Sequence, residues 1–580
     1  MGGGESCLDK LRSKMNNFSD YSLRMYLGND IVDTLIEWTP SDQQVFNKRR
    51  LIEMILTIHG FGILKNKGFR EDLLKRCDEN EILEFRSYLK GDLQQSKDLQ
   101  KIIKVVAESP WRDNAISQHL LELFQIDCSI LNSNTEQFDT EINVENDEQF
   151  YELLDYQYYI KQRVLNYLNS DVLLERMLVH MPTGTGKTKT AMHTIVNYYN
   201  FTLKKKGLII WIAHTTELLQ QALDTFNNVW KHLGDGSTIA YRVWGNGNLE
   251  LQDEPYNGFM FLGLSKLMSI SDLNPQLFEK LIIDTRLIVY DEAHKIAAGK
   301  TRSIIEKFMV KKPDMENRAL LGLTATPGRS TDESFDNTLL SNMFSNKIIS
   351  IDTKILNAMN LSTIKALNSQ AEEDIIKYFQ NRRILAKIVK EELTYLTELS
   401  DTEIRAIKVK TVDNGYEDFT KEALEVIGMN QNRNIEIMKR LRQLNAEGKP
   451  TIVFACSVKH AKLLSSMLTL EDIPNSLVVA DISPMERKKA IQAFKNRSNK
   501  TNIIINYEVL TTGFDSTNIQ CVFIARPTQS IVLYSQMLGR GLRGPQMGGN
   551  ETCLLIDVKD NLQSYNENMA FSHFKNYWRG

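Results

Sequence analysis

The stretch Met181-Pro182-Thr183-Gly184-Thr185-Gly186-Lys187-Thr188 follows an apolar run and precedes a helical one. A loop of this composition binds phosphate, because its glycines let backbone N–H groups close on phosphate oxygens. The lysine reaches the β- and γ-phosphates, the next hydroxyl ligands Mg²⁺, and the helix that starts here adds the positive end of its dipole. The strict pattern begins with glycine, whereas this chain has Met181 in that place.

A second, acidic segment completes the predicted nucleotide site. Asp291-Glu292-Ala293-His294 follows the apolar run Leu287–Tyr290, so we expect Asp291 at the carboxyl end of a buried strand. Parallel α/β sheets bind ligands at that end. Thr188 and Asp291 are therefore the expected Mg²⁺ ligands, and Glu292 is expected beside the attacking water. The predicted phosphate-binding residues are Thr183, Gly184, Thr185, Gly186, Lys187 and Thr188.

Length and composition describe an ordinary globular protein. The 580 residues give room for three or four domains of ~150 residues each. Hydrophobic residues make up 42% and charged residues 25%, and the net charge of -3 gives no global basic field. The six cysteines form no CxxC pair, and no stretch reaches ~18 consecutive apolar residues. We therefore predict a cytoplasmic protein without a zinc site, an iron–sulfur site or a membrane span.

Hydrophobic periodicity divides the first part of the chain into three segments. Residues 1–128 are expected to form a helical domain, and residues 129–150 an acidic linker, because no Lys or Arg occurs from Ser129 to Ile160. Residues 151–356 alternate strand-like and helical stretches, which predicts a doubly wound parallel sheet. The expected strands are Met177–Met181, Gly207–Ala213, Phe259–Leu262, Leu287–Asp291 and Ala319–Leu323.

The second part of the chain is expected to begin with a helical insert over residues 357–430. Leu385, Val389, Leu393 and Leu396 recur there at helical spacing. Residues 431–561 then form a second α/β unit without a phosphate loop, and residues 562–580 a C-terminal tail. The expected strands of this second α/β unit are Thr451–Ala455, Ser476–Val479, Asn502–Ile505, Cys521–Ile524 and Cys553–Asp557. This order suggests that the nucleotide lies in the cleft between the two α/β units.

Two further segments carry a family resemblance. Leu323–Arg329, which contains Thr-Ala-Thr-Pro, resembles the third motif of the superfamily 2 helicases, and Gln536–Arg543 resembles their sixth, QxxGRxxR. The resemblance implies two tandem RecA-like parallel-sheet domains that bind ATP and Mg²⁺ between them. It assigns catalytic roles to Lys187, Glu292, Gln536, Arg540 and Arg543, the two arginines acting as arginine fingers. It also implies that His294, Thr324 and Thr326 couple the nucleotide site to the nucleic acid.

Weaker matches extend the resemblance. Trp211–Leu218 is similar to motif Ia, and Leu510–Asp515 is similar to motif V. These matches imply that His214, Thr215, Thr511 and Thr512 contact a sugar-phosphate backbone, and that Asp515 lies at the nucleotide. Gln157 resembles the glutamine upstream of the phosphate loop that reads adenine. Contacts to the backbone hold a strand without reading its sequence, so non-specific, salt-dependent binding is expected.

Within superfamily 2, the chain most resembles the group of type III restriction motor subunits, RadD-like helicases and XPB-like translocases, which act mainly on DNA. The resemblance implies a DNA helicase or translocase with a role in repair, restriction or phage defence. Two alternatives stay open. One is an ATPase switch, triggered by nucleic acid, whose N-terminal helical domain binds a protein partner that carries the effector chemistry. The other is an RNA helicase.

Overall fold

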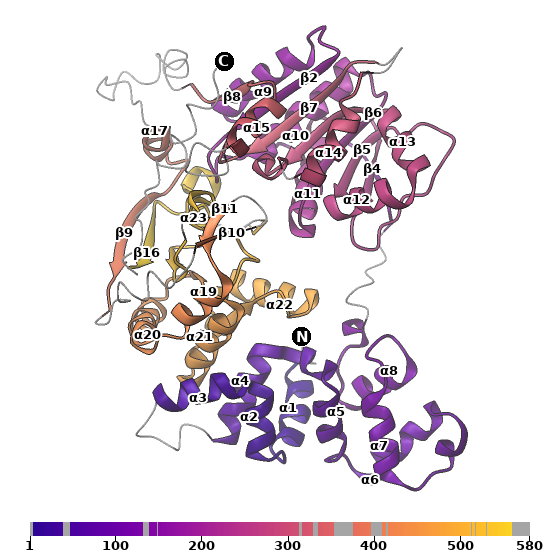
Figure 1. The fold of residues 1–580 in the computed structure, drawn as a ribbon, viewed down its shortest axis with the longest axis vertical. Coiled ribbons are helices and arrows are strands. Elements are labelled where there is room, and N and C mark those ends of the chain that lie inside the picture. The colour runs from indigo at the N-terminus through magenta and orange to yellow at the C-terminus, as the bar shows by residue number, and fades with distance from the viewer. Residues whose placement is uncertain are drawn as a thin grey trace.

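The computed structural model describes residues 4–38, 47–131, 139–147, 149–297, 299–311, 316–328, 335–352, 375–395, 409–412, 416–511, 513–514, 516, 518–528 and 530–559. The predicted features Leu396, Thr512, Asp515 and the tail 562–580 fall outside these ranges, as do parts of the predicted linker 129–150 and of the predicted insert 357–430. No helix in the described ranges is both long and apolar enough to cross a membrane. The described chain forms an N-terminal helical domain and two α/β domains (Figure 1).

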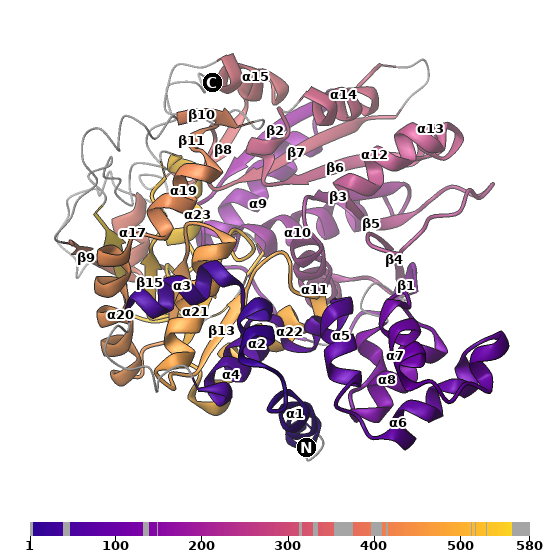
Figure 2. The ribbon, with the colours of Figure 1, turned by 60° about the horizontal axis from the view of Figure 1, so that its bottom comes forward.

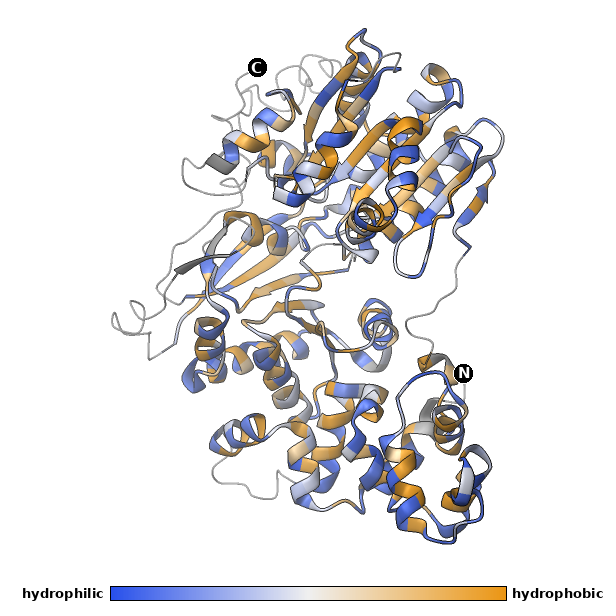
Figure 3. Cartoon of the chain, turned by 45° about the vertical axis from the view of Figure 1, so that its right-hand side comes forward, coloured by the Kyte–Doolittle hydropathy of each residue, from blue (hydrophilic) through white to orange (hydrophobic). Residues whose placement is uncertain are grey.

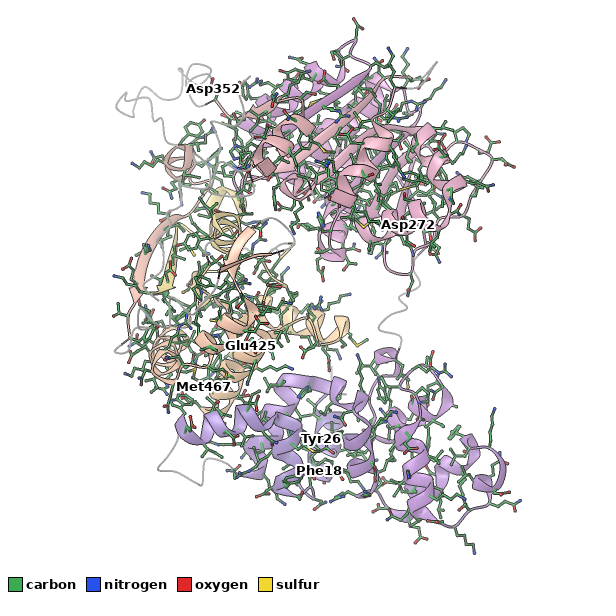
Figure 4. All side chains as sticks on the ribbon, in the orientation of Figure 1. Phe18, Tyr26, Asp272, Asp352, Glu425 and Met467 are labelled. Carbon is green, nitrogen blue, oxygen red and sulfur yellow. The ribbon has the colours of Figure 1, made fainter. Side chains whose placement is uncertain are left out.

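The N-terminal domain is helical, as predicted, and its described residues up to Leu131 include no strand. Its helices start where side chains cap them: Asn47, Asn66 and Asn114, for example, each accept a backbone N–H three residues ahead. Phe18 and Tyr26 pack in its interior (Figure 4), with ring centroids 6.2 Å apart. The α-helices are α1 (Gly4–Met15), α2 (Asp20–Leu27), α3 (Asn29–Trp38), α4 (Lys48–His59), α5 (Lys67–Leu74), α6 (Glu79–Glu84), α7 (Leu99–Glu108) and α8 (Ala115–Leu123).

The first α/β domain is built on an eight-stranded sheet of order β1-β4-β5-β3-β6-β7-β2-β8. All its strands are parallel except β1, and the buried strands are almost wholly apolar (Figure 3). The strands are β1 (Glu141–Val144), β2 (Leu174–His180), β3 (Leu208–Ala213), β4 (Thr238–Val243), β5 (Gly258–Gly263), β6 (Thr285–Asp291), β7 (Arg318–Thr324) and β8 (Ile348–Ser350). The helices are α9 (Asp155–Leu168), α10 (Lys187–Asn197), α11 (Thr216–Leu233), α12 (Leu264–Leu273), α13 (Pro275–Asp284), α14 (Gly299–Phe308) and α15 (Phe335–Met343).

The second α/β domain has a six-stranded, fully parallel sheet of order β13-β14-β12-β15-β16-β9. The strands are β9 (Lys387–Leu393), β12 (Thr451–Phe454), β13 (Asn475–Val478), β14 (Ile503–Asn506), β15 (Cys521–Ile524) and β16 (Thr552–Val558). The helices are α19 (Lys421–Gly428), α20 (Gln431–Ala446), α21 (Val458–Leu470), α22 (Pro484–Lys495) and α23 (Ile531–Leu538). Two doubly wound parallel sheets preceded by a helical domain confirm the predicted fold class.

Two predicted segments differ from the structure. The helix expected through Leu385, Val389, Leu393 and Leu396 is wrong, because Lys387–Leu393 forms β9. This segment lies at the edge of the sheet and pairs with β16 along its whole length. The tertiary pairing overrides the helical spacing of its apolar residues. The described part of residues 357–430 also contains α17 (Ile375–Asn381) and the hairpin β10 (Val409–Val412) and β11 (Tyr416–Phe419).

The predicted acidic linker also contains structure. Glu141–Val144 is strand β1, which pairs antiparallel with β4 and extends the first sheet. It is an edge strand in which Glu141 and Asn143 are exposed and Val144 is buried, so it lacks the apolar run by which buried strands are recognised. The region between the N-terminal domain and the first α/β domain is therefore not a linker throughout.

The N-terminal domain packs on the second α/β domain, to which it is not adjacent in sequence (Figures 1 and 2). Helix α4 lies against α21, and apolar side chains of both domains, Met467 among them, form one hydrophobic cluster. Polar contacts line the same interface: Arg50 donates to the Leu470 carbonyl, and the Gly62 amide donates to the Glu486 carboxylate at 2.9 Å. Lys459 forms an ion pair with Asp30 at 2.6 Å.

The buried Arg70 holds two parts of the N-terminal domain together, because its guanidinium donates to the carbonyls of Leu64, Lys65, Ala107 and Ser109. We predict that Arg70→Met lowers the free energy of unfolding by about 3 kcal/mol, since it leaves buried carbonyls without donors. Denaturant unfolding measures this loss. Arg49→Met, at an exposed arginine, is the control and should change stability by less than about 0.5 kcal/mol. Equal stability of the two variants would contradict the role of Arg70.

Candidate nucleotide site

The predicted phosphate loop connects the end of β2 to the start of α10. Gly184 and Gly186 have φ angles of 84° and 80°, in the left-handed region that favours glycine. A Cβ on Gly186 would lie 2.3 Å from Nε2 of Gln157, so the loop approaches α9 too closely for a side chain. The Thr185 hydroxyl donates to the Pro182 carbonyl at 2.7 Å and closes the loop on itself. The sequence thus adopts the backbone that phosphate binding requires.

Lys187, in the first turn of α10, points between the two carboxylates that follow β6. Its Nζ lies 3.9 Å from Oδ1 of Asp291 and 3.8 Å from Oε1 of Glu292. Asp291 ends the strand, and its Oδ1 accepts the Glu292 backbone N–H at 3.0 Å. Glu292 has a φ of 53°, so the backbone turns sharply there and both carboxylates face the lysine. The structure therefore brings the three residues together as the sequence predicts.

The two carboxylates differ in their electrostatic environment. Burial raises the pKa of Asp291 to about 6, although Lys187 opposes the shift. Burial also raises the pKa of Glu292, but the cations Lys187, Lys295 and Arg540 outweigh it, and the pKa falls to about 2. Glu292 is therefore ionised at neutral pH. Arg540 belongs to the other α/β domain, so charge from across the interface reaches this carboxylate.

His294, Thr324 and Thr326 form a hydrogen-bonded cluster behind the carboxylates. The Thr324 hydroxyl donates to the Thr326 carbonyl at 2.8 Å and accepts the Thr326 N–H at 3.1 Å. Because the hydroxyl proton is used, Nδ1 of His294 is the donor in its 3.2 Å contact with Thr324. Burial lowers the pKa of His294 to about 3, so the ring is neutral. The cluster connects the Glu292 segment to the end of β7.

Gln157 lies on α9 directly against the phosphate loop. Its Oε1 accepts the Leu154 backbone N–H at 2.9 Å, and its Nε2 donates to the Thr185 carbonyl at 3.0 Å. The adjacent Tyr156 hydroxyl donates to the same carbonyl at 2.8 Å. Sequence reasoning missed Tyr156, although a residue next to the predicted adenine-reading glutamine was a natural candidate. Both side chains thus fix α9 to the loop.

The segment after α23 brings the predicted arginine fingers against the phosphate loop. A Cβ on Gly539 would lie 2.5 Å from Cγ2 of Thr183, and one on Gly184 would lie 3.8 Å from Cγ of Arg543. Arg540 donates to the Phe514 carbonyl at 2.5 Å and to the Gln536 carbonyl at 3.3 Å. The structure therefore places the segment Gln536–Arg543 at the phosphate loop, with the two domains in contact.

The residues predicted to touch nucleic acid come from both domains, and His214 lies close to the Asp291–His294 segment. Nε2 of His214 lies 2.9 Å from the Tyr290 hydroxyl, and the Thr215 hydroxyl caps α11 by accepting the Leu218 N–H. The Thr511 hydroxyl donates to the Glu508 carbonyl. A Cβ on Gly513 would lie 3.3 Å from the Leu218 nitrogen, so the two segments meet across the domains.

The donors present fit a nucleotide and Mg²⁺. Two glycines leave the loop amides open to phosphate, Lys187 supplies a cation, and Thr188 and Asp291 supply the hydroxyl and carboxylate oxygens that Mg²⁺ prefers. Among the described residues, no group of three or more His, Cys, Asp or Glu side chains forms another metal site. The arrangement defines a nucleotide-binding class of protein with two RecA-like domains, whose loops meet at the predicted site.

Comparison with known proteins identifies the family. The model of the type III restriction enzyme res subunit matches residues 150–329, and that of the helicase conserved C-terminal domain matches residues 432–544. The ATP-dependent helicase IRC3 of Saccharomyces cerevisiae is 24% identical over 376 residues, which are 64% of this chain and 46% of IRC3. The ATP-dependent DNA helicase mph1 of Aspergillus fumigatus is 30% identical over 181 residues, which are 31% of this chain and 15% of mph1.

Among solved structures, a fragment of an HsdR subunit of a type I restriction enzyme from Vibrio vulnificus matches 76% of this chain and 69% of its own. The identity is 18% and the TM-score 0.45. The chain spans about half the length of IRC3. The chain belongs to the superfamily 2 helicases and is related to the restriction motor subunits.

Gly541, between the two predicted fingers, has no room for a side chain: its Cβ would lie 2.3 Å from Sγ of Cys553 and 2.7 Å from Val522. We predict that Gly541→Ala displaces Gly539–Gly544, the finger loop, and lowers the kcat of ATP hydrolysis on the order of 10- to 100-fold, with little change in the KM for ATP. Steady-state ATPase kinetics test this. Gly299→Ala, where a Cβ would meet nothing within 4 Å, is the control. A Gly541→Ala protein with the parent kcat would disprove the steric argument.

Proposed function

We propose that this protein hydrolyses ATP between its two RecA-like domains and uses the resulting domain motion to translocate along DNA or to separate its strands. The observation that carries the proposal is the composite site: Lys187 lies between Asp291 and Glu292 on one domain, and the segment with Arg540 and Arg543 contacts the phosphate loop from the other. Hydrolysis would then require the closed arrangement, which links the chemistry to domain motion.

Each residue has a chemical task in the proposed reaction. The phosphate-loop amides and Lys187 would hold the β- and γ-phosphates, and Thr188 and Asp291 would hold Mg²⁺, which neutralises charge on the phosphate oxygens. Glu292 is ionised and only partly buried, so it can accept a hydrogen bond from the attacking water and orient it. Arg540 and Arg543 would stabilise the negative charge that spreads over the γ-phosphate in the transition state.

Two lines of support favour DNA as the polynucleotide. The family model with the longer match is that of a restriction enzyme subunit, and mph1 is named as a DNA helicase. Contacts from His214, Thr215 and Thr511 would reach the sugar-phosphate backbone, so binding would be non-specific in sequence and weakened by salt. A role in repair, restriction or phage defence is part of this proposal. We also propose a cytoplasmic location, in keeping with the five free thiols of the described residues.

The second candidate function is an ATPase switch. The N-terminal domain contributes no residue to the nucleotide site described above, yet it shares a hydrophobic cluster with the second RecA-like domain. It would therefore follow that domain when the two RecA-like domains close or open. In this function, the N-terminal domain would present the nucleotide state to a protein partner rather than assist strand separation.

Removal of either half of the composite site should stop the reaction. We predict that Lys187→Ala and Arg543→Ala each reduce nucleic-acid-stimulated ATP hydrolysis by about 10³-fold or more, because an arginine finger typically contributes 10³ to 10⁵ in rate. ATPase assays at saturating nucleic acid measure the loss, and thermal melts show whether each variant is folded. A folded Lys187→Ala protein that hydrolyses ATP at the parent rate would refute the site assignment.

The choice of polynucleotide is tested by titrating one preparation with single-stranded DNA, duplex DNA and RNA of equal length. We expect DNA to stimulate hydrolysis and RNA to stimulate it at least about tenfold less, with stimulation falling as salt increases. Stimulation by RNA alone would overturn the DNA proposal. Strand displacement or translocation assays on the same sample separate the two candidate functions, because a switch hydrolyses ATP on duplex DNA without moving along it.

A further inference from the structure

The segment Ile375–Ala386 bridges the two halves of the nucleotide site. It comprises α17 and the turn that leads into β9, and its apolar residues join a hydrophobic cluster drawn from both RecA-like domains. Phe379 and Arg382 contact α9 of the first domain. The backbone of Ile384 and Ala386 is hydrogen-bonded to the finger loop of the second domain. The segment therefore reaches both sides of the site within twelve positions.

The contacts with α9 involve the residues beside the predicted adenine-reading Gln157. The ring of Phe379 meets that of Tyr156 edge-on, with centroids 4.9 Å apart. Nη2 of Arg382 donates to Oδ1 of Asp155 at 2.9 Å, and Nη1 donates to the Tyr378 hydroxyl at 2.7 Å. Because the Tyr156 hydroxyl is bonded to the phosphate loop, the segment contacts the helix that holds the loop.

The contacts with the finger loop are made by backbone atoms. The Ala386 N–H donates to the Leu542 carbonyl at 2.8 Å, and the Gly544 N–H donates to the Ile384 carbonyl at 2.9 Å. Leu385 and Arg543 face each other in this antiparallel bridge. Only one residue, Arg383, lies between Arg382 and Ile384, so a displacement of the Arg382 side chain would reach the backbone that is hydrogen-bonded on either side of Arg543.

We propose that Arg382 is a positioning residue of the ATPase: its ion pair with Asp155 fixes the finger loop relative to the phosphate loop, so that occupation of the adenine end of the site is sensed at Arg543. This inference rests on the proposed function and adds to it. The ion pair is partly buried, with side-chain exposures of 29% for Arg382 and 35% for Asp155, which shields it from solvent more than a surface pair.

The chain offers a matched control at the next position. Arg383 forms its ion pair with Glu551 at the surface, and its side chain is 60% exposed. Arg382→Gln and Arg383→Gln remove the same charge from neighbouring positions. Only the first of the two substitutions removes the contact with α9.

The test compares the parent chain of residues 1–580 with Arg382→Gln, Asp155→Asn, their double variant and Arg383→Gln, in ATPase assays at saturating DNA. We expect Arg382→Gln and Asp155→Asn each to lower kcat on the order of tenfold, with the KM for ATP changed less than about threefold. The double variant should lose no more than the larger single loss, because both changes break one interaction. Arg382→Lys should recover part of the rate, and Arg383→Gln should match the parent.

Three results would overturn the inference: parent kcat in folded Arg382→Gln, losses that multiply in the double variant, or an equal loss in Arg383→Gln. If Arg382→Gln does not fold, Phe379→Leu removes the ring contact with Tyr156 while keeping an apolar side chain, and the same kcat loss is expected. Lys187→Ala, assayed in parallel, separates the two proposals. A parent without DNA-stimulated ATPase refutes both, whereas an active parent that needs Lys187 but not Arg382 refutes only this one.

Discussion

Close approach between the phosphate loop and the finger loop is the constraint on which the site depends. Gly184 on one loop and Gly539 on the other face the opposite domain, and neither position has space for a larger side chain without moving its neighbour. In this arrangement Arg540 lies within electrostatic range of Glu292, and Arg543 lies beside Gly184 of the phosphate loop. In the proposed function, charge carried by the two domains acts as one site only while the domains touch, so hydrolysis would require domain closure.

The segment Ile375–Ala386 and the N-terminal domain both contact the second RecA-like domain. The segment Ile375–Ala386 is hydrogen-bonded to the finger loop and contacts α9. It therefore contacts both RecA-like domains at the nucleotide site. The N-terminal domain is fixed to the second RecA-like domain by a shared core and by contacts such as Gly62 to Glu486. In the proposed function it would therefore move together with the second domain.

Much of the site could be predicted from sequence, because its chemistry restricts residue types at short spacing. Gly184, Gly186 and Lys187 must follow a strand and open a helix, and the structure places them so. Edge strands could not be predicted in this way. Lys387–Leu393 has the apolar spacing of a helix, and its extended form is set by hydrogen bonds to β16, which lies far along the chain. The strand Glu141–Val144 was hidden for a related reason, since its exposed polar residues resemble a linker.

The sequence by itself determined the two α/β domains, their buried parallel strands and the residue types of the nucleotide site, because local periodicity and short motifs encode these features. The tertiary structure decided which surfaces meet. It joined the residues on either side of Arg543 to the backbone at positions 384 and 386, and it placed Arg382 against Asp155. It also docked the N-terminal domain on the distant second domain rather than on its neighbour in sequence. Such contacts join residues hundreds of positions apart, so no local pattern records them and only packing selects them.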